Sequence, residues 1–173
     1  MEKLYADNIL NILSTSFYIE KEVKGTHFSG ERLRIDAILK PKQNLLWKNP
    51  NVSLGIEFKS VENLKSTKDI THWLTQCIDY ANTNWDKYGY IYIFSCPSIF
   101  NKLSYNVQDK EWLWNRILSN LGIGRLEQHS IYGWTFYLQD SHRIWSQKDG
   151  IIAGKTWSLN RKFGRTHFSQ LIE

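Results

Sequence analysis

Two acidic residues and a lysine stand in two short segments in which apolar and polar residues alternate. Asp36 lies in the segment 33–39, and Glu57 and Lys59 lie in the segment 54–60. Such alternation is typical of a half-buried β-strand, whose successive side chains point to opposite faces of the sheet. If the two strands pair, the two carboxylates and the ammonium meet. Because Mg²⁺ prefers oxygen ligands, the sequence predicts a divalent-metal site with a cation beside it.

Each segment divides into a buried set and a polar set of side chains. The expected buried sets are Leu33, Ile35, Ala37 and Leu39 in the first segment and Leu54, Ile56 and Phe58 in the second. Arg34 shares the polar face with Asp36, and Glu57 shares its face with Gly55 and Lys59. From this position Arg34 either contacts substrate phosphate or pairs with the Asp36 carboxylate, and both roles stay open.

These residue types suit phosphodiester hydrolysis. A Mg²⁺ or Mn²⁺ ion at Asp36 and Glu57 would polarise a phosphoryl oxygen and lower the pKa of a bound water. Lys59, two residues after Glu57 on the same strand face, would orient that water or offset charge in the transition state. The expected cofactor is therefore Mg²⁺ or Mn²⁺.

Helices and further strands must position these side chains. The apolar spacing predicts helices over 3–13, 68–84 and 109–121, and strands over 17–23, 88–95 and 124–137. Ser66 or Thr67 is the expected N-cap of the second helix, along which His72, Gln76 and Tyr80 follow at four-residue intervals. This order of elements predicts an α/β fold, a mixed central sheet flanked by helices.

The two acidic motifs and the helix after them resemble the PD-(D/E)xK nuclease superfamily over roughly residues 1–95. The resemblance implies a restriction-endonuclease-like core, with Asp36 as the first metal-binding acid, Glu57 as the second and Lys59 as the lysine of the closing motif. The run from Gln76 to Tyr80 looks like the Gln-x-x-x-Tyr motif of the RecB-like branch. In that branch the glutamine and the tyrosine support the active site and the nearby DNA.

The sequence departs from the family pattern at two points. Ile35 stands where the family's proline would be. The further acid that the first helix often contributes in the family would be Glu2, Asp7 or Glu20, and the sequence does not choose among them.

Composition and charge indicate one basic globular domain over residues 1–173, with a core over about 1–140. The chain is 42% hydrophobic and 23% charged, which excludes disordered and fibrous classes, and its net charge of +5 favours DNA as a partner. Cations and aromatics alternate in the extension over about 141–173, where the expected nucleic-acid contacts are Lys155, Arg161, Lys162 and Arg165. A solvated basic surface over core aromatics would give the same pattern.

The remaining sequence features concern compartment. Cys77 and Cys96 have no metal-ligand spacing, so reduced, buried thiols are expected. No signal peptide and no segment of transmembrane length is evident, which predicts a cytoplasmic protein without membrane contact.

Together these features favour a Mg²⁺-dependent deoxyribonuclease, an endonuclease, with Asp36, Glu57, Lys59 and Gln76 in the catalytic site and Arg34 and Tyr80 near the DNA. A homodimer would place two such sites on one duplex. One alternative is a non-catalytic nucleic-acid-binding or regulatory protein on a nuclease-like scaffold. Another is a protein-interaction factor with an aromatic surface.

Overall fold

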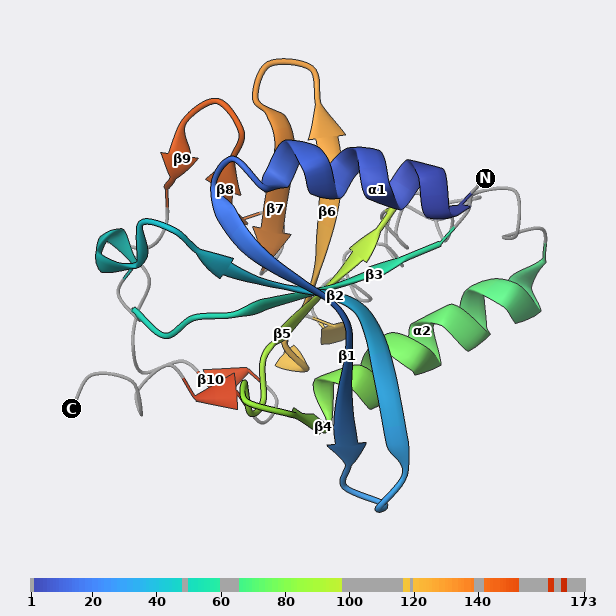
Figure 1. The fold of residues 1–173 in the computed structure, drawn as a ribbon. Helices are drawn as coiled ribbons and strands as arrows, with labels where there is room; N and C mark the ends of the chain where they lie inside the picture. Colours follow the sequence, from blue (N-terminus) through green and yellow to red (C-terminus); the bar gives the residue numbers. More distant parts are fainter. Residues whose placement is uncertain are drawn as a thin grey trace.

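The computed structural model describes residues 2–47, 50–59, 66–97, 117–118, 120–138, 142–152, 162–163 and 166–167. Its elements are α1 (Glu2–Leu13), β1 (Phe17–His27), β2 (Arg32–Pro41), the 3₁₀ turn η1 (Asn44–Leu46), β3 (Leu54–Phe58), α2 (Thr67–Ala81), β4 (Thr83–Trp85), β5 (Tyr92–Cys96), β6 (Ile123–His129), β7 (Gly133–Leu138), β8 (His142–Ser146), β9 (Gly150–Ile151), β10 (Lys162–Phe163) and β11 (Thr166–His167). Nine strands form one sheet in the order β4-β1-β2-β3-β5-β6-β7-β8-β9, and β10 pairs with β11 (Figure 1).

The α2 helix begins at a capping box, whose N-cap is one of the two residues that the sequence predicts. The Asp69 backbone N–H donates to the Ser66 hydroxyl at 3.2 Å, and the Ser66 backbone N–H donates to the Asp69 carboxylate at 2.9 Å. The pair satisfies two donors that a helix start leaves without intrahelical partners. Ser66 is therefore the N-cap, and α2 starts at a position fixed by local chemistry.

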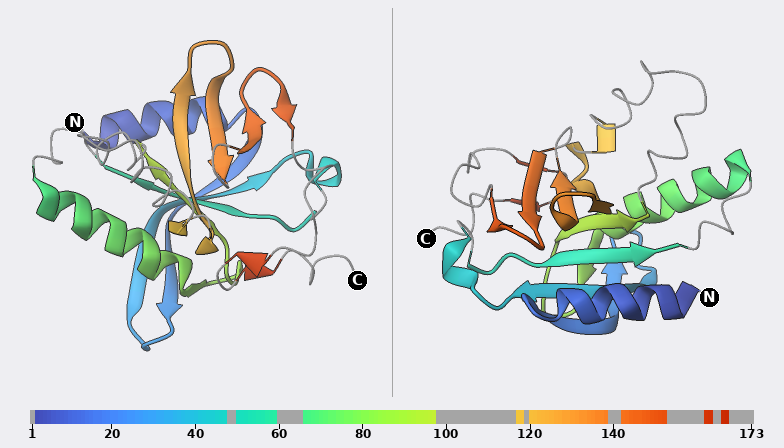
Figure 2. Two further views of the ribbon diagram at one scale, coloured as in Figure 1. Left: turned by 180° about the vertical axis from the view of Figure 1, so that it is seen from behind. Right: turned by 90° about the horizontal axis from the view of Figure 1, so that it is seen from above.

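The two helices lie on opposite faces of the sheet, with β3 between them (Figure 2). On one face, Ile9, Leu10 and Leu13 of α1 pack into a core with Leu54, Ile56 and Phe58 of β3. On the other, Trp73, Leu74 and Cys77 of α2 pack into a second core with Ile38, Ile91 and Ile93. All five residues of β3 are buried. The expectation that β3 is only half buried is therefore wrong, because apolar layers cover it on both faces.

The sheet curls on itself. Five strands separate β1 from β8 in the strand order, yet the rings of Phe17 and Trp145 lie 5.0 Å apart between centroids. Phe17 also meets Phe136 of β7, with centroids 5.9 Å apart. The curl brings β1 and β8, each next to an edge strand of the sheet, into the core that α1 joins. Cross-sheet aromatic contacts thus close the structure into a half-barrel.

The predicted fold class is wrong. An α/β sheet flanked by helices, with a restriction-endonuclease-like core, was expected, but 47% of the structure is strand and 26% is helix. The described residues contain two α-helices beside the curled nine-stranded sheet. The predicted helix over 109–121 lies mostly outside those residues. Sheet curvature, rather than helical layers, encloses much of the core, because β7 and β8 fold back toward β1.

The β1–β2 ribbon changes faces at one residue. Glu22 has φ +58°, and the paired register of β1 with β2 skips from Lys21–Ala37 to Val23–Ile35. Ala37 packs on the α1 side of the sheet, whereas Val23 and Ile35 pack on the α2 side. The expectation that Ile35 shares a face with Ala37 is therefore wrong, because the left-handed residue rotates the ribbon between them.

Two smaller expectations can be compared with the fold. Cys77 and Cys96 are free and buried, as predicted. The strand predicted over 88–95 starts later, because β4 and a turn at Gly89 (φ +70°) precede it.

Among the described residues, no helix has both the length and the apolarity to span a membrane.

Candidate active site

The two predicted metal ligands occupy the point where the pairing of β2 with β3 ends. Ala37–Ile56 is the last pair of this antiparallel ladder, so Asp36 and Glu57 are the next residues along each strand. The Phe58 backbone N–H donates to Asp36 Oδ2 at 2.8 Å. The Asp36 carboxylate thus accepts a hydrogen bond that a backbone carbonyl would accept in a continued ladder. This bond fixes the carboxylate between the two strands.

The Glu57 carboxylate is held from the α2 side. The residue is only 6% exposed, and the Gln76 side-chain amide donates to Glu57 Oε1 at 2.8 Å. The same amide nitrogen lies 2.8 Å from the Tyr80 hydroxyl oxygen. A primary amide carries two N–H donors, so Gln76 can serve both acceptors. Glu57 is therefore oriented by a side chain that is itself fixed.

Tyr80 completes a chain of hydrogen bonds between the two strands. Its hydroxyl donates to the Arg34 backbone carbonyl at 2.7 Å, two residues before Asp36 on β2. Glu57, Gln76, Tyr80 and the Arg34 backbone are thus linked in series. The sequence predicts Gln76 and Tyr80 as supporting residues, and the structure brings both to this position. The chain joins β2 to β3 through α2 where the ladder no longer does.

Both carboxylates affect the pKa of the Tyr80 hydroxyl. Burial raises the pKa of Tyr80, and the charges of Glu57 and, more weakly, Asp36 raise it further. Burial and the charge of Glu57 also raise the pKa of the Cys77 thiol well above its usual range. Both groups stay neutral at physiological pH. A buried carboxylate among neutral neighbours is costly to keep charged, and a divalent cation would offset that cost.

Lys59 follows β3 directly. Its backbone N–H donates to the Cys96 carbonyl at 2.8 Å, which extends the β3–β5 pairing by one residue. Its side chain is half-buried. Within the part of the chain that the structure describes, the ammonium forms no ion pair. A lysine thus follows Glu57 directly at the end of β3, the strand that pairs with the strand of Asp36.

A cleft of about 600 Å³ adjoins Asp36 on the α1 side. It is lined by Lys3, Ala6, Asp7, Leu10, Lys21, Glu22, Asp36 and Phe58. Lys21 and Asp7 form an exposed ion pair across it, at 2.6 Å. Solvent can therefore reach Asp36 through a cleft whose walls hold both acidic and basic side chains.

Arg34 forms its ion pair with Glu22 of β1. The sequence left two roles open for Arg34, a phosphate contact or an ion pair with Asp36. The structure shows an ion pair with Glu22 and not with Asp36. Glu22 was not a predicted site residue, although it lines the cleft beside Asp36. Its left-handed backbone brings it there, and the sequence offers no glycine or asparagine at that position to indicate such a conformation.

The remaining predicted contacts fall on the C-terminal extension. Lys155, Arg161 and Arg165 lie outside the described residues. Lys162 belongs to β10, of which the backbone alone is described. In the described ranges no group of three or more His, Cys, Asp or Glu side chains is placed to hold a metal ion. The candidate site therefore rests on a pair of carboxylates.

No family model, curated protein or solved structure matches the chain. Function must therefore be argued from the local chemistry of Asp36, Glu57, Lys59, Gln76 and Tyr80.

Removing the Tyr80 hydroxyl tests the chain of hydrogen bonds. Tyr80→Phe leaves the Arg34 carbonyl without this donor, and we expect a loss of about 1–3 kcal/mol in the free energy of unfolding. Any activity of the site should fall about tenfold, because the β2–β3 spacing loosens. Urea denaturation and a cleavage assay measure the two effects.

Tyr88→Phe is the matched control. The Tyr88 hydroxyl donates to the Glu20 carboxylate at 2.6 Å, away from the site, and burial raises its pKa to about 12. This variant should lose stability without losing activity. Equal activity losses in both variants would contradict a positioning role for Tyr80.

Proposed function

We propose that this protein is a metal-dependent nuclease that hydrolyses DNA phosphodiester bonds. The observation that carries the proposal is the position of Asp36 and Glu57 opposite each other, directly after the last pair of the β2–β3 ladder, with Glu57 held by Gln76. Lys59 follows β3 directly. Two carboxylates on paired strands and a lysine after the second strand would supply oxygen ligands and a cation for phosphoryl chemistry.

The donor set suits Mg²⁺ or Mn²⁺. Mg²⁺ commonly takes one or two protein carboxylates and completes its shell with water and substrate phosphate. A structural zinc site needs four protein ligands and a catalytic one three, and the described residues hold no such cluster. Asp36 and Glu57 would hold the ion, which when bound would lower the pKa of a water and polarise the phosphoryl group.

The residues of the chain have separable roles in this proposal. Asp36 is oriented by the Phe58 backbone N–H and Glu57 by Gln76, so neither carboxylate needs to reorganise. Lys59 stabilises the negative charge that develops on the transferring phosphoryl group. Gln76 and Tyr80 act as positioning residues, because they hold the strands and the Glu57 carboxylate in place.

DNA is the proposed substrate because the net charge of the chain is positive and two lysines line the cleft beside Asp36. The chain carries a net charge of +5, and Lys3 and Lys21 line the cleft beside Asp36. Neutralising backbone phosphates releases counterions and makes binding sensitive to salt. Affinity for DNA should therefore fall as salt rises.

Within the described residues no third side chain is placed to complete a metal-holding group with the pair, and this favours a second candidate. This is a nucleic-acid-binding or regulatory protein that does not cleave. It requires DNA binding that is indifferent to Mg²⁺ and to the loss of Asp36 or Glu57. The two candidates therefore differ in one measurable property, the dependence on divalent cations.

The deciding experiment uses the full chain on supercoiled, linear, single-stranded and branched DNA. Each substrate is incubated with Mg²⁺, with Mn²⁺ and with EDTA. We expect cleavage of at least one form with either cation and none with EDTA. Salt-sensitive binding with no cleavage of any form would reject the nuclease and select the second candidate.

A further inference from the structure

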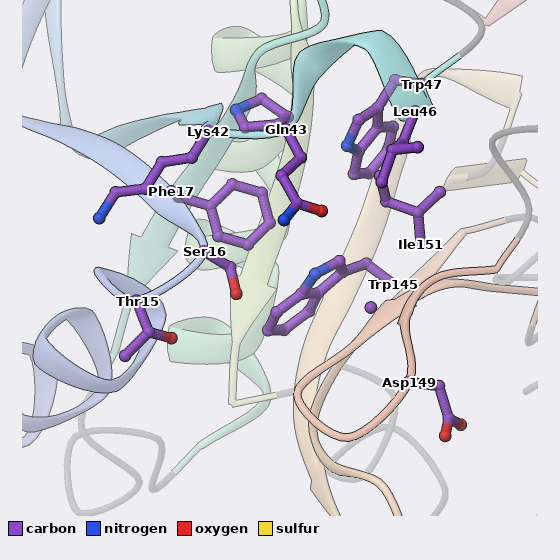
Figure 3. Close-up of a pocket in the computed structure, with 12 residues that line it drawn as sticks. Thr15, Ser16, Phe17, Lys42, Gln43, Leu46, Trp47, Trp145, Asp149 and Ile151 are labelled. Carbon is purple, nitrogen blue, oxygen red and sulfur yellow. The ribbon is translucent and has the colours of Figure 1, made fainter.

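A hollow of about 380 Å³ lies between the α1–β1 junction, η1 and the β8–β9 hairpin (Figure 3). Phe17, Trp47 and Trp145 line it, but they are buried in the core on the α1 side and offer no free face to a ligand. The Lys42 side chain points away from it (Figure 3), and its ammonium lies over the Tyr18 ring. This hollow is therefore a product of core packing. The cleft beside the candidate site is different, because charged side chains line it.

Glu22 lines that cleft and lies opposite Asp36 in the register of β1 with β2. Asp36 in turn lies opposite Glu57 of β3, directly after the last pair of the β2–β3 ladder. Three acidic residues on adjacent strands therefore follow one another in register, and two of them belong to the candidate site. Like charges opposite each other destabilise a sheet, so a cation is favoured beside this row.

Arg34 supplies a cation there. Its guanidinium forms an ion pair with the Glu22 carboxylate, and the two side chains are 62% and 58% exposed. An ion pair this exposed to water adds little to stability, so another anion can replace the glutamate at small cost. A phosphate is suited to do so, because a guanidinium donates two parallel hydrogen bonds to it.

The backbone of Glu22 is strained. Its φ of +58° is a left-handed conformation that is unfavourable in any residue with a Cβ. Strain of this kind persists where the surrounding structure imposes it, and it is concentrated at functional sites. Arg34 precedes Asp36 by two residues, about 6.6 Å of strand. A phosphate on its guanidinium would therefore adjoin the candidate site.

We propose that Glu22 occupies the phosphate-binding position of Arg34 in the free protein, and that a backbone phosphate of DNA displaces it. The inference rests on the proposed function for its ligand, DNA, but it depends on no metal and on no cleavage step. Because the phosphate must outcompete a carboxylate already in place, the pair selects against ligands that meet Arg34 through a weaker acceptor.

The test measures binding of the full chain to a fluorescently labelled DNA duplex by anisotropy. It is carried out in EDTA and at low salt, where charge contacts are strongest. Glu22→Gln removes the competing charge and should bind the duplex about three- to fivefold more tightly than the wild type. Arg34→Gln removes the phosphate contact and should bind it more weakly.

Asp86→Asn is the matched control. Asp86 pairs with Arg32, two residues before Arg34 on β2, and the Arg32 and Asp86 side chains are 50% and 51% exposed. The pair does not line the cleft. Asp86→Asn changes the net charge by the same amount as Glu22→Gln, and it should bind the duplex nearly as the wild type does. The difference between the two variants therefore isolates the effect of position.

Combining Glu22→Gln with Arg34→Gln separates displacement from simple repulsion. If a phosphate displaces Glu22 from Arg34, most of the gain from Glu22→Gln should disappear once Arg34 is replaced, because no ion pair remains to be broken. If Glu22 only repels DNA, the gain should be equal or larger without Arg34.

Glu22→Gly separates the carboxylate from the backbone. Glycine adopts a φ of +58° without strain, so this variant should unfold no more easily than the wild type. It should gain the same affinity for the duplex as Glu22→Gln, because both variants remove the competing carboxylate.

Three results would overturn the inference. The first is equal affinity in Glu22→Gln and Asp86→Asn. The second is an undiminished gain from Glu22→Gln when Arg34 is replaced. The third is a gain in Glu22→Gly alone, which would assign the effect to the backbone.

The same assay distinguishes this inference from the proposed function. If the wild type bound no duplex, both would be overturned. If Glu22→Gln gained affinity as expected while the wild type cleaved no DNA with Mg²⁺, the displacement of Glu22 would be supported and only the nuclease rejected.

Discussion

Asp36→Asn should abolish metal-dependent cleavage of DNA while leaving the protein folded. The asparagine oxygen can still accept the Phe58 backbone N–H that Asp36 accepts at 2.8 Å, so the end of the β2–β3 ladder keeps its hydrogen bond. The substitution removes one negative charge from the metal ligands. We expect cleavage to fall by a factor of about 100 or more, the scale seen when one preorganised electrostatic group is lost.

Glu57→Gln should have the same effect for the same reason. A glutamine oxygen can accept from the Gln76 amide, as Glu57 Oε1 does at 2.8 Å. Titration of each variant with Mn²⁺, followed by isothermal calorimetry, measures whether the cation is still bound. Both variants should show weakened binding together with lost cleavage.

Glu31→Gln is the control for charge alone. Glu31 is exposed in the turn between β1 and β2, and its loss changes the net charge by the same amount as Asp36→Asn. Cleavage and Mn²⁺ binding should both remain. Full activity in Asp36→Asn and Glu57→Gln would show that the two carboxylates do not hold the catalytic ion.

The local elements of this fold could be predicted because local sequence specifies them. The helices follow apolar residues at helical spacing, and Ser66 with Asp69 defines the start of α2. The strands that carry Asp36 and Glu57 follow from period-two alternation and form where expected, as β2 and β3. Short-range patterns are sufficient where neighbours in sequence are also neighbours in space.

The curl of the sheet could not be predicted in this way. It depends on contacts such as Phe17 with Trp145, between residues more than a hundred positions apart. The change of face at Glu22 could not be predicted either. A φ of +58° is uncommon for glutamate, so its residue type does not indicate this conformation. Both features arise from packing of the whole core, which explains why an α/β fold was predicted where a half-barrel forms.

The candidate site was easier to predict than the fold that carries it. Glu57 and Gln76 need only one strand and one helix to meet, and Asp36 needs only one strand pair to lie opposite Glu57. The cleft residue Glu22 depends on the ribbon twist at its own left-handed backbone. Sequence patterns therefore predict which residues become neighbours within one strand pair or one helix better than they predict the clefts around them.

Trp73→Ala should cause the largest loss of stability among the substitutions considered. Trp73 is fully buried in α2, in the core that joins α2 to the sheet. Truncating a buried tryptophan to alanine costs about 3–5 kcal/mol, a large part of the stability of a typical domain. Urea denaturation followed by circular dichroism should show a matching fall in the free energy of unfolding.

Trp73→Phe separates packing from hydrogen bonding at the same position. The Trp73 indole N–H finds no hydrogen-bond partner among the described residues, so phenylalanine keeps most of the apolar volume and removes a polar group that gains nothing. We expect a loss below about 1.5 kcal/mol. Ile131→Ala is the surface control, because Ile131 is 60% exposed and should change stability little.

The stability of α2 is linked to the candidate site, because α2 carries both Gln76 and Tyr80. Trp73→Ala should therefore reduce cleavage even under conditions in which the protein remains folded, whereas Trp73→Phe should retain it. If Trp73→Ala were destabilised as expected and yet cleaved DNA like the wild type, the hydrogen bonds from α2 to Glu57 and to the Arg34 backbone would not be what positions the carboxylates.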